Sequence, residues 1–281
     1  MRLAIMGSGG VGGYFGARLA EAGQEVTFIA RGEHLAEMRR HGLRVSSIEG
    51  DLHLPEVKAT DDPAKAGAMD AVLVAVKSWQ VAEAARAIRP MIGPDTFVVP
   101  LENGVEAADI LADRLGQAHV LDGLCGILAW REAPGHIRHA GVSPFVRFGE
   151  RDNRRSKRAE RLKAAFDQAR GVTAEIPDDI QVAVWSKFLF ICAMSGIGSV
   201  TRAPIGVTRS LPETRTMIEQ ILAEIEAVAR ARGVALPADA VERAMRFIDA
   251  LPEASTASMQ RDIMAGRPSE LESQNGAVVR L

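Results

Sequence analysis

The chain of 281 residues is expected to form an α/β protein, with an N-terminal doubly wound parallel sheet and a C-terminal all-helical domain. In the first half, short apolar runs alternate with stretches of helical periodicity, which is the rhythm of βαβ units. The run at residues 71–76 is continuous and rich in valine, as expected of a strand covered on both faces. Beyond Pro177 only helical patterns remain. These observations predict two domains, residues 1–177 and residues 178–281.

The predicted elements of the first domain alternate regularly. Parallel strands are expected at residues 3–6, 25–30, 71–76, 96–101 and around 119–124, with helices between them at 11–22, 79–88 and 105–115. Gly23 ends the first of these helices and Pro90 closes the second. Residues 45–60 are irregular, with room for short extra strands. Residues 126–149 predict antiparallel strands appended to the sheet, and residues 172–176 predict a last edge strand.

The second domain contains one strong amphipathic pattern. In a helix expected at residues 213–232, apolar side chains recur on one stripe and charged side chains lie mostly opposite. The stripe consists of Met217, Ile218, Ile221, Leu222, Ile225 and Val228. We interpret it as packing between helices that also permits a homodimer. The basic cluster at residues 151–158 is punctuated by acidic residues, which favours a solvated loop that leads into a helix up to Ala169.

Composition narrows the classes of function. Apolar residues make up 47% of the chain and charged residues 25%, as in ordinary globular proteins. The formal net charge of −2 gives no reason to expect a nucleic-acid partner. No run approaches the length of a transmembrane span and no charged leader precedes the first strand, so we expect a cytoplasmic protein without a membrane partner.

The cysteines and histidines do not indicate a metal site. Cys125 and Cys192 lie in apolar stretches and are expected to be buried thiols, in keeping with a reducing compartment. His136 and His139 fall in the expected hairpin region, where surface positions are expected. No metal is therefore expected.

A glycine-rich segment follows the first apolar run directly. It consists of Gly7, Ser8, Gly9, Gly10, Val11 and Gly12. Between a strand and a helix, this GxGxxG pattern predicts a Rossmann-type dinucleotide site. Gly7 allows the tight turn, Gly9 lets peptide N–H groups approach a pyrophosphate, and Gly12 lets the helix pack closely on the strand. The phosphate charge is expected at the N-terminus of that helix.

The end of the second strand indicates which dinucleotide is bound. Sites selective for NAD usually carry an acidic residue there, which accepts a hydrogen bond from the ribose 2′-hydroxyl. This chain has Arg31, whose guanidinium suits the 2′-phosphate of NADP(H). The alternative is that Arg31 is an ordinary solvated loop residue, and the nearby Glu33 keeps that alternative open.

Three further residues follow predicted strands or lie on a predicted helix where a ligand is expected. Lys77 follows the strand at 71–76, and Asn103 follows the strand at 96–101. Lys187 lies within the apolar run at 185–190 of the second domain. A lysine in such a run either extends to the surface along its alkyl stem or projects into a cleft, and the residues alone favour the surface.

With these residues in view, the chain resembles the ketopantoate reductases (2-dehydropantoate 2-reductases), which reduce a small 2-keto acid with NADPH. The similarity runs nearly end to end and in order. Besides the glycine segment it comprises Val76-Lys77 with Gln80, Asn103-Gly104, Trp185 with Lys187-Phe188, Ser258-Met259, Asp262-Ile263, Gly266 to Glu270, and Asn275-Gly276.

The resemblance implies roles for individual residues. Lys187 corresponds to the catalytic lysine, whose ammonium stabilises the developing alkoxide and supplies a proton. Glu270 corresponds to a glutamate near the nicotinamide and the substrate. The pattern from Ser269 to Glu272 reads as a capping box, so Glu270 is expected in the first turn of a helix. Other implied contacts are Asn103 to nicotinamide and substrate, Lys77 to the cofactor, Ser258 to the substrate and the Ala129 main chain to the cofactor.

The chain departs from the family pattern at substrate-binding positions. Family members usually carry asparagines four and eight residues after the lysine, where this chain has Ile191 and Ser195. Another asparagine is often found at the position of Ser255. Lost amides change the hydrogen bonds that hold a substrate, so the identity of the keto acid is left open. The family also commonly continues with one more helix beyond the position of Leu281.

The leading hypothesis is an NADPH-dependent reductase of a small 2-keto acid, with ketopantoate as the first substrate to test. Lys187 is then expected to face the nicotinamide between the two domains. One alternative keeps the chemistry but uses a more apolar 2-keto acid that packs against Ile191. Another is a non-catalytic NADPH-binding protein, which the presence of both Lys187 and Glu270 disfavours.

Overall fold

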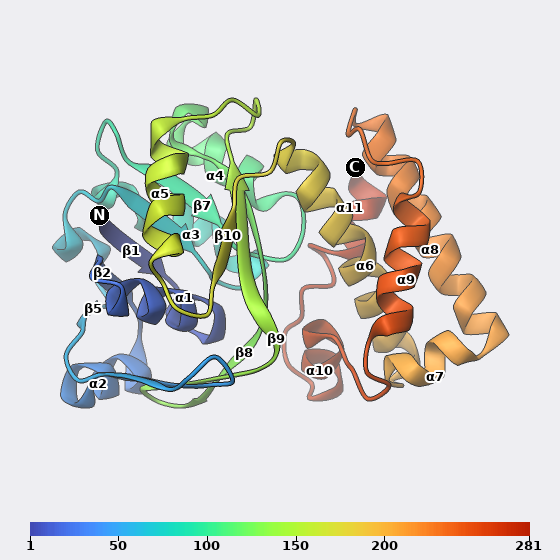
Figure 1. Cartoon of the computed structure of the whole chain (residues 1–281), viewed down its shortest axis with the longest axis horizontal. Coiled ribbons are helices and arrows are strands. Elements are labelled where there is room, and N and C mark those ends of the chain that lie inside the picture. The colour runs from blue at the N-terminus through green and yellow to red at the C-terminus, as the bar shows by residue number, and fades with distance from the viewer. The chain divides into compact units, whose positions relative to one another are not determined.

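The computed structural model describes all residues from Met1 to Leu281, and these form two compact units. The first unit comprises Met1–Glu102 and Ala107–Ile180, and the second comprises Asn103–Glu106 and Gln181–Leu281. The first carries a parallel sheet with helices and the second is helical, which confirms the predicted fold class (Figure 1). The inclusion of Asn103–Glu106 in the second unit was not predicted from the sequence.

The parallel sheet has the strand order β5-β2-β1-β6-β7. Its strands are β1 (Arg2–Met6), β2 (Glu25–Ile29), β5 (Lys58–Thr60), β6 (Ala71–Val74) and β7 (Phe97–Pro100). All four neighbouring pairs are parallel. The helices that alternate with them are α1 (Gly10–Glu21), α2 (Gly32–His41), α3 (Val81–Ala87) and α4 (Ala107–Leu115).

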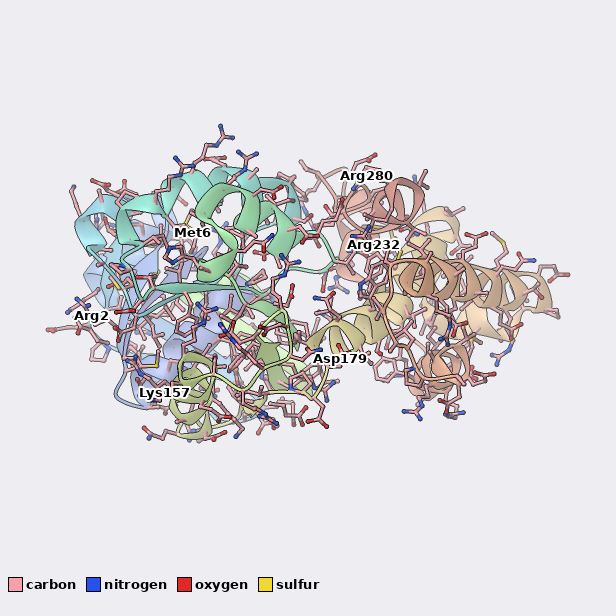
Figure 2. All side chains as sticks on the ribbon, turned by 90° about the horizontal axis from the view of Figure 1, so that it is seen from above. Arg2, Met6, Lys157, Asp179, Arg232 and Arg280 are labelled. Carbon is pink, nitrogen blue, oxygen red and sulfur yellow. The ribbon has the colours of Figure 1, made fainter.

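Both faces of this sheet are covered, as the continuous apolar runs predict. Along β1, Leu3 and Ile5 belong to one core cluster, and Ala4 and Met6 belong to another. The first cluster includes α1 and the second includes α3 and α4. Arg2, by contrast, is exposed at the start of β1, and Figure 2 shows it at the outside of the unit with Met6 inside.

A second sheet packs on the other side of α1. It contains β3 (Leu43–Ser47), β4 (Leu52–Leu54), β8 (Asp122–Ala133), β9 (His136–Gly149) and β10 (Thr173–Glu175). Its order is β10-β9-β3-β4, with β8 antiparallel to β9. The predicted antiparallel strands at 126–149 and the predicted edge strand at 172–176 are therefore confirmed, but the expectation that the former extend the parallel sheet is wrong, because they belong to this second sheet. Helix α5 (Lys157–Asp167), capped by the Ser156 hydroxyl, lies between β9 and β10 in the chain.

The prediction of a fifth parallel strand around residues 119–124 is wrong. Only an isolated bridge between Val98 and Val120 continues the parallel sheet, and β8 then pairs with β9. The reason lies in backbone hydrogen bonding, since β7 offers four residues whereas β9 offers fourteen. β8 therefore satisfies far more of its peptide groups in the second sheet.

The second unit is built around one apolar helix, α6 (Ile180–Thr201). The other helices are α7 (Ile205–Ser210), α8 (Pro212–Ala231), α9 (Ala240–Ala250), α10 (Ser258–Met264) and α11 (Asn275–Arg280). In α8 the predicted apolar stripe is buried at Ile218, Leu222 and Ile225. Met217 is 45% exposed, so it does not belong to the buried part of the stripe within this chain.

By length and composition α6 could cross a membrane, so the prediction that no run approaches such a span is wrong for this helix. Half of its most apolar window is buried inside the structure, and Trp185, Phe188 and Cys192 belong to the core cluster of the unit. Core helices of soluble proteins meet the same criterion, so α6 is weak evidence for a membrane span.

The two cysteines are free and buried, as predicted. The expected surface position of His139 is wrong, because its side chain is 1% exposed. Its Nδ1 lies 2.8 Å from the Ser47 hydroxyl, and its ring lies 4.8 Å from that of Tyr14. Pairing of β9 with β3 turns this histidine toward α1, which the sequence pattern of one strand cannot reveal.

Candidate active site

The glycine segment forms the connection between β1 and α1. Gly7 has φ +95°, and a Cβ atom there would lie 2.7 Å from the Ala75 carbonyl oxygen. A Cβ atom on Gly12 would lie 2.1 Å from the Gly7 carbonyl oxygen. Both positions therefore exclude any side chain, and the loop closes against β1 and the residues that follow β6.

The N-terminus of α1 offers room and donors for an anion. Gly9 is its N-cap, and a Cβ atom there would meet nothing within 4 Å. No side chain caps α1, and its first turn carries no acidic residue. The first N–H groups of a helix lack acceptors within the helix, and the dipole favours negative charge there. This end of α1 therefore fits a pyrophosphate.

Ser8 within the loop and Ala129 beside it make different contacts. The Ser8 hydroxyl donates to the Ile29 carbonyl at 3.1 Å and is 3% exposed, so it fixes the loop to β2. Ala129, on β8, brings its carbonyl oxygen to the loop, because a Cβ atom on Gly10 would lie 2.4 Å from it. The structure thus places Ala129 beside the predicted phosphate site.

Arg31 is the N-cap of α2 and directly follows β2 and Ala30. Its guanidinium lies 3.4 Å from the Glu83 carboxylate, and the two side chains are 63% and 61% exposed. Such an exposed pair contributes little stability. The guanidinium can therefore exchange Glu83 for a phosphate at small cost.

Lys77 lies three residues beyond the end of β6. Its peptide N–H donates to the Gln80 side chain at 3.3 Å, and its ammonium lies 5.8 Å from the centre of the Trp79 ring. The contact of Gly7 with Ala75 shows that this segment and the glycine loop lie at the same end of the parallel sheet. Lys77 is thus held beside the predicted coenzyme site.

In the second unit, the ammonium of Lys187 donates to the Asn103 side-chain oxygen at 2.8 Å. Lys187 is half-buried on α6, so its side chain does not simply extend into solvent. Asn103 belongs to the short segment Asn103–Glu106 that joins this unit. The structure therefore brings together two residues that are 84 positions apart in the sequence.

The segment that contains Glu270 packs against the segment Asn103–Glu106. A Cβ atom on Gly104, which has φ +112°, would lie 2.8 Å from the Ser273 carbonyl oxygen. The Ser273 N–H donates to the Glu270 carbonyl at 3.1 Å, and Glu270 is 5% exposed. The turn that carries Glu270 therefore packs on the segment that holds Asn103.

The predicted helical position of Glu270 is wrong. Residues 271–274 form a turn, and α11 begins only at Asn275. The Gln274 N–H donates to the Glu270 carbonyl and closes a single helical turn. Gln274 itself has φ −106° and ψ −94°, which are not helical angles, so the turn does not continue into α11. The helix dipole therefore does not explain the state of the Glu270 carboxylate.

The remaining predicted substrate positions differ in accessibility. Ile191 is half-buried and packs against the core of the second unit. Ser195 is fully buried, and its hydroxyl has no hydrogen-bond partner. Ser258 is the first residue of α10 and is half-buried.

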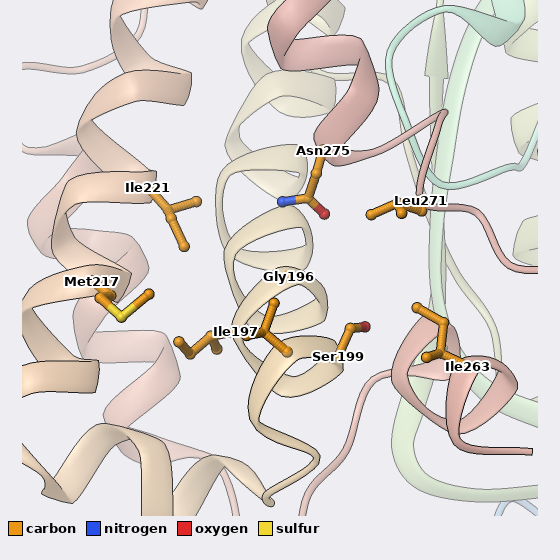
Figure 3. Close-up of a pocket in the computed structure, with 9 residues that line it drawn as sticks. Gly196, Ile197, Ser199, Met217, Ile221, Ile263, Leu271 and Asn275 are labelled. Atoms are coloured by element: carbon orange, nitrogen blue, oxygen red, sulfur yellow. The ribbon is translucent and has the colours of Figure 1, made fainter.

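A pocket of about 380 Å³ opens beside α6, and no motif in the sequence indicates it. It begins at Gly196, nine residues and so about 13 Å along the helix from Lys187. Figure 3 shows Met217 and Ile221 of α8 on one wall and Ile263 and Leu271 on the other. The lining carries no charged side chain; its polar members, Ser199 and Asn275, each have a buried oxygen without a partner.

The comparisons with known proteins agree along the whole chain. Residues 3–153 match the family described as ketopantoate reductase PanE/ApbA, and residues 179–281 match its C-terminal counterpart. The 2-dehydropantoate 2-reductase of Halobacterium salinarum is 32% identical over 281 residues, covering 99% of this chain and 91% of that protein. An uncharacterized oxidoreductase of Bacillus subtilis, YkpB, is 31% identical over 284 residues, with coverage of 99% and 91%.

The solved structures give the same result. The 2-dehydropantoate 2-reductase from Geobacter metallireducens superposes with a TM-score of 0.92 at 32% identity, covering 100% of this chain and 92% of that one. The resemblance drawn from the sequence motifs is thereby confirmed. The chain belongs to the ketopantoate reductase (PanE/ApbA) family and is an oxidoreductase.

Proposed function

We propose that this chain reduces a small 2-keto acid to the 2-hydroxy acid with NADPH, and that ketopantoate is the first substrate to test. The family supports 2-keto acid reduction in general. The observation that carries the proposal for this chain is the 2.8 Å hydrogen bond to Asn103 from Lys187, which is the one charged residue of α6. A cation held in such surroundings is suited to act on a developing negative charge.

Ketopantoate reductases use NADPH, and the first unit fits that coenzyme. The open space at Gly9 and the uncapped end of α1 suit the pyrophosphate, and Arg31 suits the 2′-phosphate. Ala129 and Lys77 border the same site. When bound, the reduced nicotinamide supplies the hydride.

Lys187 performs the proton chemistry in this proposal. As the keto carbon gains a hydride, its oxygen becomes an alkoxide, which the ammonium stabilises and then protonates from Nζ. Asn103 accepts a hydrogen bond from Nζ and so fixes where the ammonium points. Glu270 supplies a carboxylate that accepts from a substrate hydroxyl and balances the charge of Lys187. In sum, keto acid, NADPH and a proton give hydroxy acid and NADP⁺.

A second candidate substrate is a 2-keto acid with a larger apolar side chain. Ile191, which stands four residues after Lys187 in place of an amide, favours it. Ketopantoate carries a hydroxyl, which an apolar wall does not bind. Both candidates use the same reaction at Lys187.

The test is NADPH consumption measured with a panel of 2-keto acids that includes ketopantoate and straight and branched apolar homologues. Turnover of ketopantoate above the others supports the first candidate, and turnover of an apolar acid with ketopantoate inert supports the second. Tight NADPH binding without turnover of any keto acid contradicts both and favours the non-catalytic alternative. A homodimer, a cytoplasmic location and the absence of metal, membrane and nucleic-acid partners stay predictions.

A further inference from the structure

His34 is a buried histidine that none of the functional motifs includes. It is the third residue of α2 and is 4% exposed. Its Nδ1 accepts a hydrogen bond from the Gly135 peptide N–H at 2.9 Å, and its Nε2 lies 2.7 Å from the Ser8 carbonyl oxygen. A peptide N–H can only donate and a carbonyl can only accept, so Nδ1 must carry a lone pair and Nε2 must carry the proton. The two contacts therefore require the neutral imidazole.

The two partners of His34 lie on the glycine loop and on the turn between β8 and β9. Ser8 is part of the glycine loop that receives the pyrophosphate in the proposed function. Gly135, with φ +69°, lies at the turn between β8 and β9. β8 also places the Ala129 carbonyl against Gly10 of the loop. His34 thus joins the loop to the hairpin that borders it.

We propose that His34 is a positioning residue for the coenzyme: its neutral imidazole ties the Ser8 peptide of the glycine loop to the Gly135 turn and so fixes the phosphate-binding shape of the loop, and protonation breaks that tie. The inference rests on the proposed NADPH function. In the cation, Nδ1–H would point at the Gly135 N–H, and two donors repel each other. Nε2–H can still donate to the Ser8 carbonyl, so the hydrogen bond from Gly135 is the one that breaks, and the loop loses its tie to the hairpin.

The surroundings of His34 resist protonation. Burial lowers the pKa of His34, the hydrogen bond to Ser8 opposes this, and the positive charge of Arg131 on β8 lowers it further. Other charged and titratable groups on the two elements that contact it are Arg31, Glu33 and Glu37 on α2, and Glu132, His136 and Arg138 on the hairpin. Because the pKa of His34 is lower in the folded protein than in the unfolded chain, the neutral imidazole stabilises the fold fully above about pH 6.5. This stabilisation is lost as the pH falls through the folded pKa.

Two substitutions separate the two hydrogen bonds. In His34→Gln the amide nitrogen replaces Nε2 and can still donate to the Ser8 carbonyl. In His34→Asn the side-chain oxygen replaces Nδ1 and accepts from Gly135, but no donor reaches Ser8. The matched control is His53→Gln, since His53 is an exposed histidine of the same unit whose Nε2 contacts the His41 carbonyl at 3.0 Å.

The measurement is the dissociation constant for NADPH and for NADH, by fluorescence titration between about pH 5 and pH 8. NADH lacks the 2′-phosphate, so any titration of that phosphate is absent from its profile. We expect wild type and His53→Gln to bind both coenzymes more weakly at the acid end. His34→Asn should bind both about tenfold more weakly at all pH values, since the Ser8 carbonyl loses its partner. His34→Gln keeps the donor to Ser8 but offers Gly135 no acceptor, so it should bind both coenzymes at all pH values about as weakly as wild type does at the acid end, without the pH dependence.

Unchanged affinity in folded His34→Asn overturns the inference, as does an acid weakening in His34→Gln equal to that of wild type. If His34→Asn fails to fold, as judged by circular dichroism, the pH profile of His34→Gln decides. Wild-type protein that binds neither coenzyme refutes the proposed function and the inference with it. Wild-type binding with unaffected His34 variants refutes the inference alone.

Discussion

Removal of the Arg31 guanidinium should weaken NADPH binding but not NADH binding. The guanidinium is 63% exposed and pairs only loosely with Glu83, at 3.4 Å. A hydrogen bond between charged groups contributes about 1.5–3 kcal/mol, and exposure favours the lower end. Arg31→Ala should therefore raise the NADPH dissociation constant about tenfold and leave that of NADH within about twofold.

Substitution of Glu83, the partner of Arg31, should have the opposite effect on NADPH binding. Because it competes with the 2′-phosphate for Arg31, Glu83→Gln should tighten NADPH binding by up to about fivefold, the equivalent of an exposed ion pair of about 1 kcal/mol. Fluorescence titration of both coenzymes measures these effects. Arg39→Ala is the control, since Arg39 is an exposed arginine of the same helix that contacts Ala59 and Asp61. Equal losses for NADPH and NADH in Arg31→Ala would refute this reasoning.

Three further predictions concern single residues. Gly9→Ala should leave the unfolding temperature nearly unchanged, because a Cβ atom there meets nothing within 4 Å. It should nevertheless weaken coenzyme binding in titrations, because the methyl group fills the pyrophosphate space, and unchanged binding would contradict the assigned site. Asn103→Ala should lower kcat about tenfold or more with little change in coenzyme affinity, because Nζ of Lys187 loses its 2.8 Å partner; a normal kcat argues against its orienting role. Burial raises the pKa of the Cys192 thiol to about 12, so alkylating reagents at neutral pH should modify it only on unfolding. Mass spectrometry measures the labelling, and rapid labelling of the native protein would contradict the burial of this thiol.

Much of the fold follows from short-range sequence patterns. β6 and β7 of the parallel sheet are visible because both of their faces are buried, which makes each run continuously apolar, whereas the short, partly exposed β5 carries no such signal. The glycine positions are readable because Gly7 has the positive φ of a tight turn and Gly12 excludes a side chain through its contact with Gly7 in the same strand–turn–helix unit. The family motifs extend this to the second unit, where Lys187 and Asn103 meet.

The features that were missed depend on long-range pairing. β8 leaves the parallel sheet because β9 offers it a longer partner, a choice that no local pattern encodes. His139 turns inward for the same reason, since β3 pairs with β9. Glu270 lies in a turn rather than a helix because Gln274 departs from helical dihedral angles. The role of His34 is also hidden, because its partners Ser8 and Gly135 lie 26 residues before it and 101 residues after it.

The catalytic assignment depends on Lys187 as the proton donor. Single-turnover mixing of a keto acid with protein saturated with NADPH measures the hydride-transfer step directly. Lys187→Ala should slow this step by about 10²- to 10⁴-fold while NADPH affinity stays within about twofold. Ser186→Ala, an exposed neighbour on α6, should react as wild type does. A Lys187→Ala protein that transfers hydride at the wild-type rate would contradict the account.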